Sequence, residues 1–191
     1  MKNEKNLKRP HFLEGARIFL TPLSIEDTDL NFAWDNDPEL SYLDGGVFRP
    51  KSIEKTRDEI SKAVLNNKML IFSIIIIESG EHMGNIVLFN MSEYNRSAHW
   101  GIKIDKIFWR QKYATEAARL LIRYAFKSLG LNKLRSGAHE NNIGSIRLQE
   151  SLGFIKEGVF RKERYIRGEY YDDIRFGMLK EEFEKLLWAN K

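Results

Sequence analysis

The strongest constraint on the fold is an isoleucine-rich run at residues 69–78, which is apolar at almost every position. β-Branched side chains favour strands, and a second apolar run at residues 84–91 follows the short polar stretch 79–82. The two runs therefore predict an antiparallel β-hairpin. The first run is also too short to span a bilayer, which takes about 20 apolar residues.

The segments around this hairpin predict a mixed sheet with helices on both faces. Apolar residues recur at helical spacing over residues 113–129, with Gly130 as the stop. Ser24 and Asp27 form a capping-box pattern for an earlier helix, which Asp37-Pro38 ends. The other expected elements are strands at 17–23, 98–104, 134–139, 154–164 and 171–178, and helices at 52–67, 142–152 and 180–188. This order of strands and helices is typical of an α/β layer architecture.

Length and composition fit one globular domain. The chain has 191 residues, of which 42% are hydrophobic and 30% charged, and this usage is ordinary for a packed domain. We expect residues 1–10 to form a loose leader and residues 11–191 to form the single domain. The absence of cysteine excludes disulfides, thiolate metal sites and a cysteine nucleophile. Because no apolar segment follows the polar, basic start, we expect no targeting signal and a cytoplasmic location.

The charge balance favours an anionic partner only modestly. The formal net charge is +4, and the basic residues are dense only in the first nine residues and at residues 161–167. A phosphorylated cofactor would satisfy this balance, as would nucleic acid or an acidic membrane. The sequence has neither an aromatic-rich basic strand pattern nor a recognition-helix pattern. We therefore expect no nucleic acid and no membrane among the partners.

The most informative block is a predicted strand at residues 98–104 followed by a loop and a helix that starts near residue 113. The free N–H groups and the positive dipole end at a helix start bind phosphate. Arg110 and Lys112 would add full charges to such a site. The alternative is a plain connection with two solvated cations.

A second block at residues 140–154 places Asn142 and Ser145 at the start of another predicted helix. Both are ordinary helix-capping residues. In a functional site they could instead bind the amide chain of a cofactor, or offer a hydroxyl that protonates a leaving thiolate.

Seven segments, three of which lie in these two blocks, occur together in the order of one family. The segments are residues 17–23 (RIFLTPL), 34–39 (WDNDPE), 113–117 (YATEA), 142–145 (NIGS), 152–154 (LGF), 157–158 (EG) and 165–173 (YIRGEYYDD). On these, the chain resembles the ribosomal-protein N-terminal acetyltransferase (RimJ/RimL) branch of the GCN5-related N-acetyltransferase (GNAT) superfamily, from about residue 16 to residue 187.

The resemblance implies a GNAT-type α/β (α+β) fold. Its central sheet would be mixed and mostly antiparallel, with about seven strands, a splay in the middle and helices on both faces. Acetyl-CoA would bind in the central cleft as cosubstrate, with no metal. The implied cofactor contacts are the backbone of Ile102, Lys103 and Ile104 for the pantetheine arm, the loop residues Arg110, Gln111, Lys112, Tyr113, Ala114 and Thr115 for the diphosphate, and Asn142. A neutral amine would then attack the thioester directly, without an acyl-enzyme.

The sequence departs from the family pattern at two places. In the diphosphate loop, Lys112 stands where glycine is expected, and Trp109 stands at a position that is usually polar. Because glycine lets the backbone approach phosphate closely, Lys112 either bends the loop differently or weakens binding, and its ammonium group compensates in part. Gln149 stands where many members carry a tyrosine general acid, and the branch's usual proposal for the proton donor is a serine at the position of Ser145.

His99 stands where the branch often has a glutamate, on the strand that leads to the cofactor loop. A histidine there could take the proton of the acceptor amine near neutral pH. The alternative is a hydrogen-bonded histidine on a sheet face. Glu116 and His139 are weaker candidates, and we expect them to be structural.

The acceptor site is expected beside an acidic stretch at residues 24–48, which has seven acidic residues and no Lys or Arg. These are Glu26, Asp27, Asp29, Asp35, Asp37, Glu39 and Asp44. The resemblance places this stretch at the border of the acceptor site, where it would attract a cationic amine. Acids also favour helix starts and turns, which is the alternative.

The sequence therefore predicts an acetyl-CoA-dependent N-acetyltransferase that acts on a primary amine, with a protein or peptide N-terminal amine as first choice. Two alternatives stay open. One is an acetyltransferase for a small polyamine or an amine antibiotic, and the other is a catalytically impaired CoA-binding regulator. We also allow for a homodimer.

Overall fold

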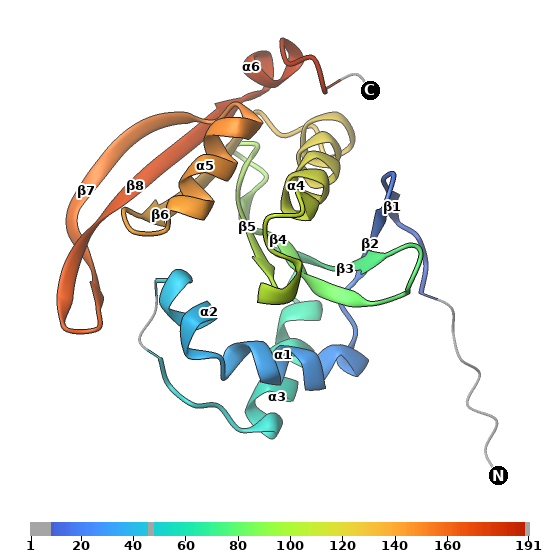
Figure 1. The fold of residues 1–191 in the computed structure, drawn as a ribbon. Helices are drawn as coiled ribbons and strands as arrows, with labels where there is room; N and C mark the ends of the chain where they lie inside the picture. Colours follow the sequence, from blue (N-terminus) through green and yellow to red (C-terminus); the bar gives the residue numbers. More distant parts are fainter. Residues whose placement is uncertain (1–8, 46–47, 190–191) are drawn as a thin grey trace.

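The computed structural model describes residues 9–45 and 48–189, and they form a single eight-stranded sheet with helices on both sides (Figure 1). The strand order is β1-β2-β3-β4-β5-β6-β8-β7. The β5–β6 pair is parallel and the other neighbouring pairs are antiparallel. The predicted mixed, mostly antiparallel α/β sheet is therefore confirmed, with one strand more than the seven expected.

The expected strands and helices are all present, and further short elements accompany them. The strands are β1 (Leu13–Glu14), β2 (Ile18–Pro22), β3 (Leu70–Ile76), β4 (His82–Ser92), β5 (Ser97–Ile104), β6 (Lys133–His139), β7 (Ile155–Ile166) and β8 (Glu169–Leu179). The helices are α1 (Thr28–Asp35), α2 (Pro38–Leu43), α3 (Ile53–Val64), α4 (Tyr113–Arg123), α5 (Ile143–Leu152) and α6 (Lys180–Glu184), with helical turns η1 (Ile25–Asp27), η2 (Lys106–Phe108) and η3 (Tyr124–Ser128). The sequence did not predict β1 and α2, and α6 is shorter than expected.

Strand β3 explains why the isoleucine-rich run is apolar at nearly every position. Its side chains alternate between the two faces of the sheet, and both faces are covered. Ile74 and Ile76 join the core beneath α4, whereas Ile75, which is also buried, lies on the opposite face. A strand between two layers of helices cannot expose either set of side chains, so a continuous apolar run results.

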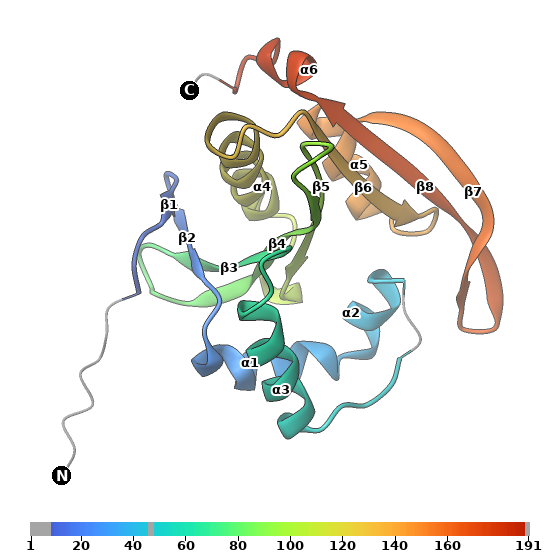
Figure 2. The ribbon, with the colours of Figure 1, turned by 180° about the vertical axis from the view of Figure 1, so that it is seen from behind.

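The helices form two layers around the sheet. Helices α4 and α5 lie on one side, and α1, α2 and α3 lie on the other (Figures 1 and 2). Asp37 caps α2 by accepting hydrogen bonds from two backbone N–H groups, and Pro38 occupies the first turn. Asp37-Pro38 therefore ends the first helix as predicted, but it also starts a second one, since proline suits the first helical position. In the described residues, no helix has the length and apolar character to cross a membrane.

The predicted capping box is confirmed and lies in a buried polar cluster. The Ser24 backbone N–H donates to Asp27 at 3.0 Å, and the Ser73 hydroxyl donates to the same carboxylate at 2.7 Å. Arg9 donates at 2.5 Å, and Nδ1 of His82 lies 3.1 Å from Asp27. Burial raises the pKa of Asp27, but its hydrogen bonds from His82, Arg9, Ser24 and Ser73 outweigh burial and hold the pKa well below its usual range.

This cluster fixes Arg9 against the hairpin and the first helical turn. Arg9 belongs to the stretch that we expected to be a loose leader, and residues 1–8 of that stretch lie outside the described part of the chain. The division into a leader and one domain stays a prediction.

The sheet splits between its two parallel strands. Strands β5 and β6 pair only from Ser97↔Lys133 to His99↔Arg135. Beyond that point, β5 remains paired with β4 up to Ile104, and β6 remains paired with β8 up to His139. Each strand therefore turns one free edge toward the other along the rest of its length.

Candidate active site

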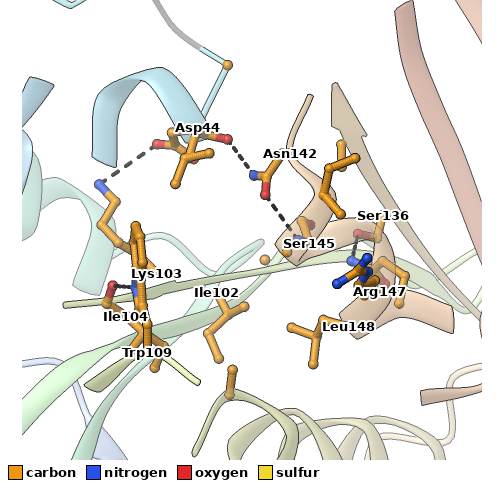
Figure 3. Close-up of a pocket in the computed structure, with 18 of the residues that line it drawn as sticks. Asp44, Ile102, Lys103, Ile104, Trp109, Ser136, Asn142, Ser145, Arg147 and Leu148 are labelled. Atoms are coloured by element: carbon orange, nitrogen blue, oxygen red, sulfur yellow. Dashed lines mark hydrogen bonds and ion pairs between the residues drawn. The ribbon is translucent and has the colours of Figure 1, made fainter. Parts of the chain in front are cut away.

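A cleft of about 880 Å³ opens where β5 and β6 diverge. In Figure 3, Lys103, Ile104 and Trp109 form one wall, and Asn142, Ser145 and Leu148 of α5 form the facing wall. Helix α2 contributes the residues at its end, including Asp44. The cleft thus combines two free strand edges with the starts of two helices.

The loop between β5 and α4 contains two left-handed residues. Arg110 has a φ of 61° and Lys112 a φ of 66°, a region that costs a non-glycine residue about 1–2 kcal/mol. Lys112 therefore adopts a conformation that glycine takes without strain. Trp109, which replaces a polar residue, donates its indole N–H to the Ile104 carbonyl at 2.8 Å.

The first turn of α4 presents unpaired backbone N–H groups to this loop. Lys112 is the N-cap residue and makes no side-chain capping hydrogen bond. Within the described part of the chain, no backbone carbonyl accepts from the N–H groups of residues 113–115. Together with the helix dipole, such groups form a binding site for an anion.

Arg17, which directly precedes β2, contacts this loop and the first turn of α4. Its guanidinium donates to Glu116 at 2.9 Å and to the Gln111 carbonyl at 3.2 Å, and it lies 4.3 Å from the centre of the Tyr113 ring. The Arg17 backbone N–H also donates to Glu116 at 2.8 Å. Glu116 is therefore a structural partner of Arg17, as the sequence led us to expect.

The cleft fits a long anionic ligand with polar groups along its length. Arg110, Lys112 and Arg147 line it. Two buried polar atoms in its lining, Nε1 of Trp100 and Oε1 of Gln149, have no hydrogen-bond partner in the described residues. Buried polar groups are rarely left unpaired, so a bound molecule is expected to supply the missing partners.

Asn142 and Ser145 lie at the start of α5, as predicted, and both line the cleft. The side-chain oxygen Oδ1 of Asn142 accepts from the Ser145 backbone N–H at 3.0 Å. The side-chain amide nitrogen Nδ2 of Asn142 donates to the Leu43 backbone carbonyl at 2.8 Å. Asn142 therefore caps α5 and ties it to the end of α2. One amide hydrogen of Asn142 stays free for a ligand.

Gln149 lines the cleft from α5 and is 3% exposed. Its amide N–H donates to the Ser136 hydroxyl of β6 at 2.5 Å. Ser136, which Figure 3 labels, follows the last residue of β6 that pairs with β5, so both side chains lie near the point where the sheet splits.

His99 does not line the cleft in the described part of the chain. Side chains alternate along a strand, so His99 shares a face of β5 with Gly101 and Lys103, which do line it. Its ring packs against Phe89 at 5.4 Å. Burial lowers the pKa of His99, and so do the positive charges of Arg135 and Arg175.

His139 does line the cleft, at the end of β6. It is 2% exposed, and the backbone of Tyr42 and Leu43 lies beside its ring. Burial is the largest influence and lowers the pKa of His139, and the charge of Arg164 acts in the same direction, whereas hydrogen bonding with the Tyr42 and Leu43 backbone acts against them. Tyr42 packs edge-on against the ring at 5.4 Å. A neutral imidazole is therefore available at this end of the cleft.

Most of the acidic stretch is already paired with cations. Lys103 and Lys51 bind Asp35 at 3.1 Å and 2.9 Å. Lys106 binds Asp37 at 2.6 Å and Glu39 at 3.3 Å. Asp27 is paired with Arg9, and Asp44 lies 3.8 Å from Lys103. The negative charge suggested by the sequence is thus reduced in the fold but not cancelled, since Asp37 and Glu39 share Lys106, and Lys51 also binds Glu59.

Six polar residues of the cleft were not predicted from the sequence: Ser136, Asn141, Arg147, Ser151, Arg164 and Asp173. Asp173 is fully buried and binds Arg164 at 3.0 Å and Arg175 at 2.7 Å. The available signal for Ser136 was its place between Leu134 and Ala138 on one face of β6, where its neighbours are apolar. Arg164 and Asp173 come from β7 and β8, and only the sheet order brings them to the cleft. In the described residues, no group of three or more His, Asp or Glu could hold a metal ion.

Known proteins resemble this chain in sequence and in fold. The sequence model of the family described as Acetyltransferase (GNAT) domain matches residues 17–155. An uncharacterised N-acetyltransferase of Bacillus licheniformis, p20, is 31% identical over 175 residues, which cover 90% of this chain and 97% of the relative. YdaF of Bacillus subtilis (strain 168), provisionally named a ribosomal N-acetyltransferase, is 36% identical over 109 residues, 57% of this chain and 60% of the relative.

A solved structure shares the fold. The spermidine N-acetyltransferase of Vibrio cholerae, in complex with CoA and spermine, aligns with a TM-score of 0.82 at 21% identity. The alignment covers 88% of this chain and 98% of that chain.

Proposed function

The chain belongs to the GNAT family of acetyl-CoA-dependent N-acetyltransferases, and from this premise we propose that it acetylates a primary amine that carries a single positive charge. The first candidate is the N-terminal amine of a peptide or protein. Acetyl-CoA supplies the acetyl group as an activated thioester. The predicted GNAT fold, enzyme class and cosubstrate are confirmed, and the acceptor and the roles of individual residues are proposals.

The diphosphate of CoA would bind at the start of α4. The unpaired N–H groups of Tyr113, Ala114 and Thr115 support this role, and so do the charges of Arg110 and Lys112 in the cleft lining. Gln111 is not among the described residues that line the cleft, because its side-chain amide donates to the Ile107 carbonyl and its own carbonyl accepts from Arg17.

The pantetheine arm would lie along the free edge of β5. Ile102 and Lys103 line the cleft beyond the last β5–β6 pair. Ile104 would contribute less, since its carbonyl already accepts the indole N–H of Trp109. Asn142 would offer its remaining amide hydrogen from the facing wall.

The observation that carries the acceptor proposal is the pairing of lysines with the acidic stretch. Asp35, Asp37 and Glu39 each have a lysine within 3.3 Å. A polyamine carries several charges and needs several unpaired carboxylates, whereas a peptide N-terminus carries one charge. The balance of Lys103 and Lys106 against these acids therefore favours the peptide.

The identity of the acceptor amine also determines how much a general base must contribute to its deprotonation. A peptide amine with a pKa near 8 costs about 1.4 kcal/mol to deprotonate at pH 7, and an amine with a pKa near 10.4 costs about 4.6 kcal/mol. We propose His99 as the base, because it shares a strand face with the cleft-lining Gly101 and Lys103 and because its lowered pKa favours the neutral imidazole. His139 is the second candidate, on its position in the cleft.

A second candidate function is the acetylation of a small polyamine. It rests on the fold shared with the Vibrio cholerae spermidine enzyme. The two functions differ in the acceptor and share the cofactor site.

Release of free thiol from acetyl-CoA, measured against a panel of amines, tests the proposal. The panel contains a short peptide with a free N-terminus, the same peptide with a blocked N-terminus, spermidine and an aminoglycoside. We expect the free peptide to have a kcat/KM at least tenfold above that of spermidine. The reverse order would overturn the single-charge proposal. Binding of acetyl-CoA without turnover of any amine would instead support a regulator.

A charge variant tests the argument about pairing directly. Lys106→Gln frees Asp37 and Glu39 and should raise kcat/KM for spermidine relative to the peptide. The matched control is Lys62→Gln on α3, which removes an exposed lysine that pairs with its helix neighbour Asp58. An equal shift in both variants would remove local pairing as the cause.

A further inference from the structure

The deepest part of the cleft is the vertex where β5 and β6 separate. The last paired residues are His99 and Arg135, so Trp100 and Ser136 are the first residues beyond the split. Both line the cleft, with 2% and 6% of their surface exposed. If the diphosphate binds at the start of α4, the arm of CoA runs inward along β5 and its thioester ends at this vertex.

Two polar side chains meet there. Gln149 of α5 donates from its amide nitrogen to the hydroxyl oxygen of Ser136 at 2.5 Å. With the amide in this orientation, the serine oxygen acts as acceptor and its own proton remains to be donated. Among the described residues, Ser136 accepts this hydrogen bond and is not seen to donate one. Because Ser136 itself lines the cleft, a molecule bound there can accept its proton.

We propose that Ser136, oriented by Gln149, donates a hydrogen bond to the sulfur of CoA as the thioester is cleaved. This inference rests on the proposed function. Many family members carry a tyrosine general acid at the position of Gln149. In this chain, Ser136 would stabilise the leaving thiolate instead.

The bonds and charges of the step balance as follows. The acceptor nitrogen forms a bond to the acetyl carbon and loses its proton to the base. The C–S bond breaks, and both of its electrons stay on sulfur. The sulfur leaves as a thiolate that accepts the Ser136 hydrogen bond, and a proton from solvent later converts it to the thiol. Because a serine hydroxyl is a far weaker acid than a thiol, Ser136 keeps its proton.

Position separates Ser136 from Ser145, the donor expected from the sequence. Ser145 lies in the first turn of α5, beside Asn142 at the open end of the cleft. Gln149 lies four residues further along the helix, which is about 6 Å, and it is the residue that contacts Ser136. The Gln149–Ser136 pair is therefore the deeper of the two, at the vertex itself.

The measurement is the apparent pKa of the CoA thiol in the bound state, followed by thiolate absorbance in the far ultraviolet across a pH series. A hydrogen bond to the thiolate lowers this pKa relative to free CoA. In Ser136→Ala we expect the bound thiol pKa to rise by about 1 unit and kcat to fall about tenfold to hundredfold, as for loss of a hydrogen bond to a charged group. The Kd of CoA should stay within about threefold.

Three other variants sharpen the test. Gln149→Met keeps the length of the side chain but removes the amide, so it should shift the thiol pKa in the same direction as Ser136→Ala. Ser97→Ala removes an equally buried serine whose hydroxyl accepts from Arg135 at 2.9 Å, and it should not shift the thiol pKa. An unchanged thiol pKa and kcat in Ser136→Ala would overturn the proposal, and so would a shift that appears in Ser145→Ala instead.

The outcomes also separate a failure of the Ser136 proposal from a failure of the proposed acetyltransferase function. If wild-type protein binds CoA and acetylates an amine but Ser136→Ala behaves like wild type, only the role of Ser136 is wrong. If wild-type protein shows no heat of binding with CoA or acetyl-CoA, the proposed function fails, and the role of Ser136 fails with it.

Discussion

Replacing Lys112 with glycine isolates the backbone strain in the cofactor loop from the charge of the lysine. Lys112 has a φ of 66° and a ψ of 9°, and a left-handed non-glycine residue costs about 1–2 kcal/mol. Glycine removes this cost but makes the unfolded chain more flexible, which costs about 0.5–1 kcal/mol. We therefore expect Lys112→Gly to stabilise the fold by about 0.5–1 kcal/mol, or to raise Tm by about 1–4 °C.

Lys112→Ala is the matched control, because alanine also loses the ammonium group but keeps the strain. Thermal unfolding of the three proteins should place Lys112→Gly above both the alanine variant and wild type. Calorimetry with CoA should give the glycine and alanine variants the same affinity, at most about fivefold below wild type, since Lys112 is exposed. A glycine variant that melts at or below the alanine variant would refute the strain argument, whereas a tenfold loss of affinity in both would identify the ammonium group as a direct phosphate ligand.

Three further perturbations test other parts of the structure. Arg17→Lys keeps the charge but loses the paired contacts to Glu116 and the Gln111 carbonyl. KM for acetyl-CoA should therefore rise about threefold to tenfold. Binding of acetyl-pantetheine should stay unchanged, because this molecule lacks the diphosphate. His99→Ala should lower the rate most near neutral pH, where the imidazole is unprotonated because its folded pKa is lowered. The loss should shrink at acid pH, where protonation removes this base from wild type as well, and an unchanged pH profile would exclude His99 as the base. Asp27→Asn should lower the free energy of unfolding in urea by about 3 kcal/mol at pH 7. Because the folded pKa of Asp27 lies below its unfolded value of 3.8, the carboxylate's contribution is complete above that pH and is lost as the pH falls below it, so the deficit of Asp27→Asn should shrink at acid pH.

Local patterns were sufficient to predict most of the elements. The hairpin, the long helix at α4 and the capping box at Ser24 depend on neighbours in sequence, and all three are present. Helix α2 was missed because Asp37-Pro38 is an equally good signal for a helix end and a helix start. The two-residue β1 carries too few residues for any periodic pattern.

The cofactor loop was predictable and the electrostatics of the acceptor side were not. The loop is a continuous segment whose helix start can be recognised from its own residues. The charge of the acidic stretch depends on Lys51, Lys103 and Lys106, which lie outside it in sequence and reach it only in the fold. Likewise, Ser136 and Gln149 are 13 residues apart and meet only because α5 packs on β6.

The contacts of Arg17 also bear on how the chain folds. They join residues 94 and 99 positions apart in sequence, so the anion-binding loop is braced only after a long stretch of chain has closed on itself. Contacts of such high sequence separation form slowly. A newly made chain should therefore gain affinity for CoA at a late stage, when its amino-terminal strand docks, which makes ligand binding a reporter of completed folding.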